Sequence, residues 1–181
     1  MREPSKEEMI DLLKDVFGLV KVLMTESERA SVILASARMD VDLERLLKHL
    51  LLPYPGDSDP MFDGDRMLGT FSAKIAMTHR LGAIDNDLEH ALQLVRKIRN
   101  DFAHDLEVES LSSQKQKGRL AELVRWAISS EMYQSGLKVM VSDGKSSEQA
   151  QFVACAICII VTLHSGLRLL SRVNVHGPLS L

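Results

Sequence analysis

Residues 86–105 of the chain read NDLEHALQLVRKIRNDFAHD, and this stretch decides the fold. At about 100° per residue, its apolar side chains fall on one face of an α-helix, which predicts an amphipathic helix over 86–103. The residues of this apolar stripe are Leu88, Ala91, Leu92, Val95, Ile98 and Phe102. A helix with one apolar face has to pack against other apolar elements, so the rest of the core must come from elsewhere in the chain.

Arg99 falls inside this stripe, at a position where an apolar residue is expected. A guanidinium stays protonated, and burying it without a partner is costly. Arg99 is therefore expected to reach solvent, to pair with an acid, or to face a cleft or subunit interface that holds an anion. Asp40 and Glu44, one turn apart on another predicted helix, are the candidate acids for an ion pair.

Helical periodicity and capping patterns recur on both sides of this stretch and predict helices over 6–24, 25–52, 68–81, 118–135 and 147–172. Residues 53–66 are rich in Pro and Gly and are expected to form a loop, and Gly82 is expected to end the helix before it. No stretch alternates as a strand would. The whole chain, 1–181, is therefore expected to be one all-α domain, a bundle of five to seven helices with its core over 6–172 and a frayed tail over 174–181.

The composition favours a globular protein. The chain has 181 residues, of which 45% are apolar and 26% charged, and this is too apolar for a disordered chain. The formal net charge of −3 argues against a protein whose whole surface binds nucleic acid. The first residues lack the apolar core of a signal peptide, and the longest apolar run, 152–163, is too short to span a bilayer. We therefore expect a cytoplasmic protein without membrane association.

Motifs that bind metals or cofactors do not occur in the sequence. Cys155 and Cys158 have C-x-x-C spacing, but they lie inside the apolar run and have no second Cys or His pair, so two reduced core thiols are expected. The acidic turn at 63–65 resembles the start of a calcium loop, but Lys74 occupies the twelfth position, where Glu is required. Phosphate-binding and dinucleotide-binding motifs are also missing. The sequence predicts no metal and no cofactor.

The end of the predicted helix over 86–103 has the chemistry of a phosphodiester site. Arg99, Asn100 and His104 form an R-x4-H arrangement with a polar residue after the arginine. Arginine holds phosphate bidentately and histidine transfers protons near neutral pH, so cleavage of RNA by its own 2′-OH would need no metal. On an unbroken helix Arg99 and His104 point about 140° apart. They serve one ligand only if the helix ends near Ala103 or a second protomer contributes.

Two family resemblances are carried by these residues. RNDFAHD at 99–105 resembles the R-x4-H signature of the HEPN superfamily, many members of which are dimeric, metal-independent ribonucleases. A longer stretch, 27–105, is similar to the mannitol operon repressor family, called MtlR or MltR. The family features in this stretch are the turn Asp63-Gly64-Asp65, the step Leu68-Gly69, the turn Leu81-Gly82-Ala83-Ile84, Arg99, and His104-Asp105. This resemblance implies an all-helical regulator of sugar-alcohol uptake genes, without implying a DNA-binding element.

Three functions from different classes follow. The longer resemblance predicts a transcriptional regulator, a repressor of the mannitol-operon type. The lack of a basic recognition helix favours action through protein contacts, and the sequence leaves open whether the chain is also an enzyme. One alternative is a HEPN-type endoribonuclease in which Arg99 holds phosphate, Asn100 orients the groups and His104 is the acid or base. The other is a helical module that binds a partner peptide. We expect a homodimer, because Arg99 inside an apolar stripe suits a two-fold cleft.

Binding residues are expected in two places. Arg96, Lys97 and Arg99 would form a small basic cleft that attracts RNA in spite of the acidic total charge, with Arg96 and Arg99 as the binding residues. Asp63 and Asp65 of the acidic turn are the second pair of candidate binding residues. The chain has three short basic segments, 74–80, 96–99 and 119–125. The first offers few cations, and the other two share their helices with acids, unlike a typical DNA-recognition helix. A protein partner is therefore expected, with RNA or DNA as the alternative.

Overall fold

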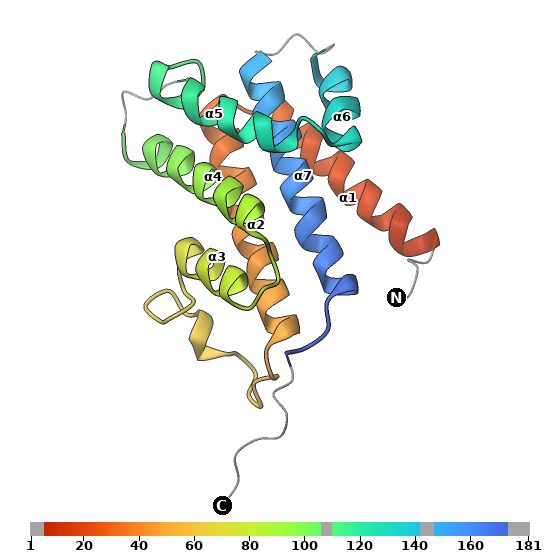
Figure 1. Ribbon diagram of the computed structural model, residues 1–181, viewed down its shortest axis with the longest axis vertical. Helices are drawn as coiled ribbons and strands as arrows, with labels where there is room; N and C mark the ends of the chain where they lie inside the picture. Colours follow the sequence, from red (N-terminus) through yellow and green to blue (C-terminus); the bar gives the residue numbers. More distant parts are fainter. Residues whose placement is uncertain (1–5, 106–109, 142–146, 174–181) are drawn as a thin grey trace, which may run out of the picture.

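The computed structural model describes residues 6–105, 110–141 and 147–173 (Figure 1). Within these residues the chain forms seven α-helices, one short 3-10 helix and no β-strand. The elements are α1 (Lys6–Thr25), α2 (Glu28–Leu50), η1 (Pro60–Phe62), α3 (Phe71–Arg80), α4 (Asn86–His104), α5 (Gln114–Ala127), α6 (Glu131–Val141) and α7 (Ser147–Leu169). The predicted all-α bundle of five to seven helices is confirmed, and the predicted frayed tail at 174–181 lies outside the described residues.

Helices α2 and α7 run side by side in the same direction through the middle of the bundle (Figure 1). At their N-terminal ends, Gln149 Nε2 of α7 donates to Ser31 Oγ of α2 at 2.9 Å, and also to Leu23 O of α1 at 3.0 Å. At their C-terminal ends, Val173 N donates to Leu50 O at 2.8 Å. The pair is fixed at both ends, and the other helices pack around it.

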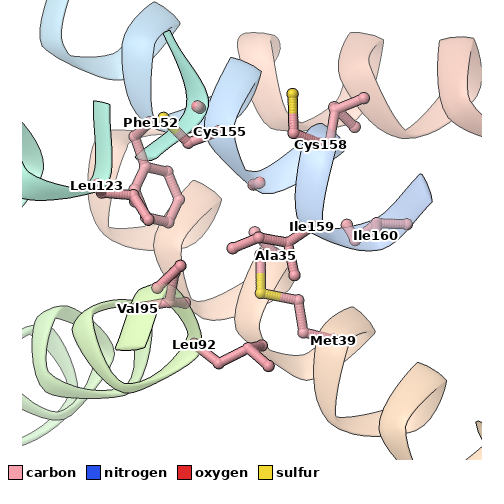
Figure 2. Packing of buried hydrophobic residues seen from close by; sticks show 14 of the residues in the cluster. Ala35, Met39, Leu92, Val95, Leu123, Phe152, Cys155, Cys158, Ile159 and Ile160 are labelled. Atoms are coloured by element: carbon pink, nitrogen blue, oxygen red, sulfur yellow. The ribbon is translucent and has the colours of Figure 1, made fainter. Parts of the chain in front are cut away.

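The main core lies between α2, α4, α5 and α7 (Figure 2). Figure 2 labels Ala35, Met39, Leu92, Val95, Leu123, Phe152, Cys155, Cys158, Ile159 and Ile160. All six residues of the stripe predicted for α4 are buried, which confirms the predicted face. Cys155 and Cys158 are buried free thiols, as predicted, and burial raises the pKa of both.

Helix α7 is long and apolar enough to cross a membrane, judged by length and composition alone. In the bundle it is nevertheless a central helix, and every residue from 152 to 160 is buried. The core helix of a soluble protein has the same composition. The prediction of a buried core helix is therefore confirmed, and this burial agrees with a soluble fold.

The starts of two helices differ from the prediction. Helix α2 begins after the N-cap Ser27, whose side chain accepts a hydrogen bond from Ala30 N, whereas Thr25 ends α1. Thr70 caps α3 in the same way, so α3 begins at Phe71 instead of at 68. Side-chain oxygens that satisfy the first backbone N–H groups set both boundaries.

The predicted helix over 118–135 is two helices, α5 and α6. Helix α5 already begins at Gln114, four residues before the predicted start, and α6 begins at Glu131. Gln134 Nε2 donates to Ile128 O at 3.0 Å and fixes the turn between them. No Pro or Gly lies at this break. Because the helical periodicity continues across it, the sequence predicted one helix instead of two.

The turn after α3 follows the prediction. Gly82 has a φ of 71°, which only glycine adopts without strain. Gly82 N donates to His79 O at 2.8 Å, and Ala83 N donates to Thr78 O at 3.1 Å, the two bonds of a Schellman motif. This turn sets α4 beside α3, and both helices pack on α2.

Candidate functional site

Arg99 lies at the edge of the buried stripe of α4, and its side chain is half-buried. Its Nη1 donates a hydrogen bond to Asn100 Oδ1 at 3.0 Å. In the described part of the chain, no carboxylate oxygen lies within 4.0 Å of its guanidinium. The predicted ion pair with Asp40 or Glu44 therefore does not form, and that prediction was wrong.

Lys74 of α3 pairs with both of these acids. Its Nζ lies 2.8 Å from Glu44 Oε2 and 3.1 Å from Asp40 Oδ1, and its side chain is only 4% exposed. Lys48 Nζ lies 2.7 Å from Glu44 Oε1. Burial alone would lower the pKa of Lys74, but hydrogen bonds to Glu44 and Asp40 outweigh burial and raise it. Because α3 packs on α2 beside these acids, Lys74 takes the place predicted for Arg99.

A cavity of about 460 Å³ lies between α2, α3 and α4, and Arg99 is part of its wall. Its apolar wall consists of Ile33, Ala37, Val41 and Phe71. Its remaining lining residues are Ser36, Asp40, Gly69, Thr70 and Arg99. Of the alternatives considered for Arg99, the structure therefore shows a cation that faces a cleft.

His104 is the last residue of α4 and is exposed. The helix is unbroken from Arg99 to His104, so their side chains point about 140° apart with a rise of about 7.5 Å along the axis. His104 also does not line the cavity. The helix ends one residue beyond Ala103, so His104 is still helical and is not turned toward Arg99. Within one chain, the structure keeps Arg99 and Asn100 together and separates His104 from them.

Asp101, inside the R-x4-H motif, fastens α4 to α5. Its Oδ2 accepts from Arg119 Nη1 at 2.7 Å and from Gln116 Nε2 at 2.8 Å, and Lys115 Nζ lies 2.8 Å away. Burial alone would raise the pKa of Asp101, but hydrogen bonds from these three side chains lower it. This part of the motif therefore has a structural role.

Arg29 of α2 contacts the end of α4, and sequence reasoning missed it. Its guanidinium donates to the carbonyl oxygens of Phe102 and Asp105 and lies 5.8 Å from the centre of the Phe102 ring. A cation is favourable at the C-terminal end of a helix and unfavourable in the first turn of one. The unfavourable position of Arg29 in the first turn of α2 is the signal in the sequence that could have indicated a partner for it elsewhere in the fold.

The other predicted binding residues lie apart from the cavity. Arg96 Nε donates to Gln93 Oε1 at 2.8 Å along α4, and Arg96 is not part of the cavity wall. Asp63 and Asp65 are exposed in the turn between η1 and α3, and neither lines the cavity. A Cβ at Gly69 would lie 2.0 Å from Asp63 O, so this turn packs closely on its own backbone. The predicted binding residues therefore do not form one site.

An exposed apolar surface lies on α1 and α6. We call it the α1–α6 patch, formed by Ile10, Leu13, Phe17, Val139 and Val141, each at least 40% exposed. A groove of about 420 Å³ continues it between the two helices, and its lining includes Phe17, Val20, Met24 and Val139. Sequence reasoning missed this patch because α1 is apolar on two faces, and only the face with Leu12 and Leu23 enters the core.

Comparison of the chain with protein-family models, with characterised proteins and with solved structures gave no match. The resemblances to the mannitol operon repressor family and to the HEPN superfamily stay predictions. The fold and the positions of the named side chains are therefore the observations from which a function has to be inferred.

Proposed function

We propose that this chain is a cytoplasmic regulatory protein of the mannitol-operon-repressor type, which forms a homodimer and acts through protein contacts. The resemblance of residues 27–105 to that family supports the regulatory role. The single observation that carries the mode of action is the α1–α6 patch, in which exposed apolar side chains of the two helices meet at the groove lined by Phe17 and Val139. Exposed apolar surface of this kind on a folded chain marks a protein-binding surface.

Direct reading of DNA is less well supported, because cations from each of the three basic segments are engaged within the fold. Lys74 is paired with two acids of α2, Arg96 with Gln93, and Arg119 with Asp101. A helix that reads DNA needs its cations on an open surface. Protein contacts therefore account better for regulation by this chain.

The charges beside the α1–α6 patch suit a second copy of the chain. Asp11 and Lys14 lie next to the apolar stripe of α1. Their side chains are 77% and 75% exposed and pair with each other at 3.6 Å within the chain, so a second copy would exchange these partners. Two α1 helices packed antiparallel about a two-fold axis near Leu13 place Asp11 of each beside Lys14 of the other. The apolar stripes then cover each other. The self-complementary pattern favours a homodimer over an unrelated partner on this patch.

The dimer is tested by measuring the mass of the purified protein in solution by light scattering after size exclusion. The wild type is expected to have the mass of two chains, and Phe17→Asp the mass of one, because a carboxylate replaces an apolar side chain that is 67% exposed on α1. Met67→Asp is the matched control, because Met67 is 70% exposed outside the patch. A monomeric wild type, or a dimeric Phe17→Asp protein, contradicts the proposed interface.

Regulation is tested in the cell of origin with a reporter gene under its mannitol-operon promoter. Deletion of the gene is expected to raise reporter expression in the absence of mannitol, and Phe17→Asp is expected to behave like the deletion. Met67→Asp should repress normally. Expression that does not respond to the deletion contradicts the regulatory role.

The variant His104→Ala distinguishes the ribonuclease alternative from the proposed regulatory role. A ribonuclease has to bring His104 to Arg99 from a second protomer, because one chain keeps them apart on α4. His104→Ala would then abolish RNA cleavage and leave both Tm and repression unchanged. A wild-type protein that cleaves no RNA removes this alternative.

A further inference from the structure

The cavity between α2, α3 and α4 has one charged group without a counter-charge. Asp40 and Glu44 contribute two negative charges, and Lys74 and Lys48 lie within 3.1 Å of them with two positive charges. Burial alone would raise the pKa of Glu44, but hydrogen bonds from both lysines lower it, so this group stays ionised at neutral pH. The charge of Arg99 is therefore left over, and it makes this wall of the cavity positive.

The guanidinium of Arg99 also has unused donors. It carries five N–H groups, and its one hydrogen bond in the described structure goes to Asn100 Oδ1. Thr70 adds a hydroxyl to the wall, which accepts from Ala73 N at 3.2 Å and keeps its own O–H as a donor. A planar guanidinium with open N–H groups matches the two oxygens of a carboxylate or phosphate. The cavity wall thus includes hydrogen-bond donors from Arg99 and Thr70 and one positive charge.

The rest of the wall is apolar. Ile33, Ala37 and Val41 follow one another at four-residue spacing along α2, and Phe71 joins them from the start of α3. The volume of about 460 Å³ lies in the range of cavities that hold small molecules. A ligand with one anionic end and one apolar end would match both parts of the wall.

We propose that this cavity binds a small organic anion, whose carboxylate or phosphate group is held by Arg99 and whose apolar part lies against Ile33, Val41 and Phe71. None of the residues of the α1–α6 patch lines the cavity, so this site is separate from the proposed dimer interface. Asp40 also lines the cavity, and Lys74 neutralises its charge.

The experiment is calorimetric titration of the full chain with four probes that share a hexyl chain: hexanoate, hexyl phosphate, hexylammonium and 1-hexanol. At least one of the two anions is expected to bind, and the cation and the alcohol are not. The two anionic probes distinguish a carboxylate ligand from a phosphate ligand. Failure of both anions to bind at millimolar concentration overturns the proposal, and so does equal binding of hexylammonium.

Variants then locate the site. Arg99→Gln is expected to weaken binding of the anion by roughly tenfold or more, because it removes a charge-assisted hydrogen bond. Arg99→Lys should retain part of the affinity. Arg96→Gln is the matched control, because it removes a positive charge from the same helix outside the cavity. Ala37→Phe should abolish binding by filling the cavity. Unchanged affinity in Arg99→Gln or in Ala37→Phe places the anion elsewhere and overturns the proposal.

Discussion

Two cations approach helix α2 from neighbouring helices, and the structure treats them differently. Lys74 of α3 is 4% exposed and has two carboxylates within 3.1 Å. Arg99 of α4 is half-buried, bonds to the amide of its own neighbour, and faces a cavity. Lys74 and Lys48 together neutralise Asp40 and Glu44, so neither of these acids remains for Arg99. A cation in the apolar stripe of a predicted helix therefore indicates that a compensating negative charge is needed nearby. Which cation pairs with the available acids depends on how the other helices pack.

The largest expected effect comes from removing the buried member of this pair of cations. Lys74→Met is expected to lower the free energy of unfolding by about 3 kcal/mol, because Asp40 and Glu44 lose their shared partner. Urea unfolding measures this change. Lys48→Met is the control, and it should cost less than about 1 kcal/mol because Lys48 is 46% exposed. A loss at Lys74 no larger than that at Lys48 would remove the contrast between the two cations.

Asp101 provides an acid on the same helix as Arg99 for comparison. Asp101→Asn is expected to cost about 2 kcal/mol, because the carboxylate receives hydrogen bonds from Arg119 and Gln116, and Gln116 is fully buried. The same urea experiment measures it. Asp65→Asn, in an exposed turn with the side chain 83% exposed, is the control and should be close to neutral. A neutral Asp101→Asn would show that α5 does not depend on this contact.

The pH dependence of folding stability tests the ion pairs of Glu44, and a smaller effect is expected. The pKa of Glu44 is lowered from its usual 4.5 in the folded chain, so its contribution is present above about pH 4.5 and is lost as pH falls through the folded value. Wild-type stability should therefore fall below about pH 4.5, and Glu44→Gln should lose less over the same range. Thermal unfolding between pH 3 and 7 measures both. Parallel pH profiles would show that Glu44 is not ion-paired in solution.

The smallest effect is expected at Arg99. Arg99→Gln should change the free energy of unfolding by no more than about 0.5 kcal/mol, because no ion pair is lost. Urea unfolding at low salt measures it. A loss of about 3 kcal/mol, the size expected for a broken buried pair, would mean that Arg99 has an acidic partner in solution.

Most of the fold could be predicted from the sequence because helical periodicity and capping are local. The stripe of α4 and the left-handed Gly82 were predicted correctly. The break between α5 and α6 was not, because the turn is fixed by a side-chain hydrogen bond from Gln134 to Ile128 O and has no residue type that breaks helices. Local patterns predict where helices form, but a break of this kind depends on a specific contact.

The site was harder to predict than the fold. The position of Arg99 inside an apolar stripe correctly marked it as unusual, and facing a cleft was among the alternatives. The pairing of Lys74 with Asp40 and Glu44 depends on how α3 packs on α2, which no local pattern contains. The same holds for Arg29, whose contacts join residues more than 70 positions apart.

The burial of Cys155 and Cys158 has a practical consequence for studies of this chain. A thiolate is the form that alkylating reagents attack, and both thiols are buried with their pKa raised. Iodoacetamide should therefore modify neither sulfur while α7 is covered by its neighbours. The rate of alkylation then measures how often the centre of the bundle opens and exposes the two thiols. The native protein therefore allows this measurement without an added label.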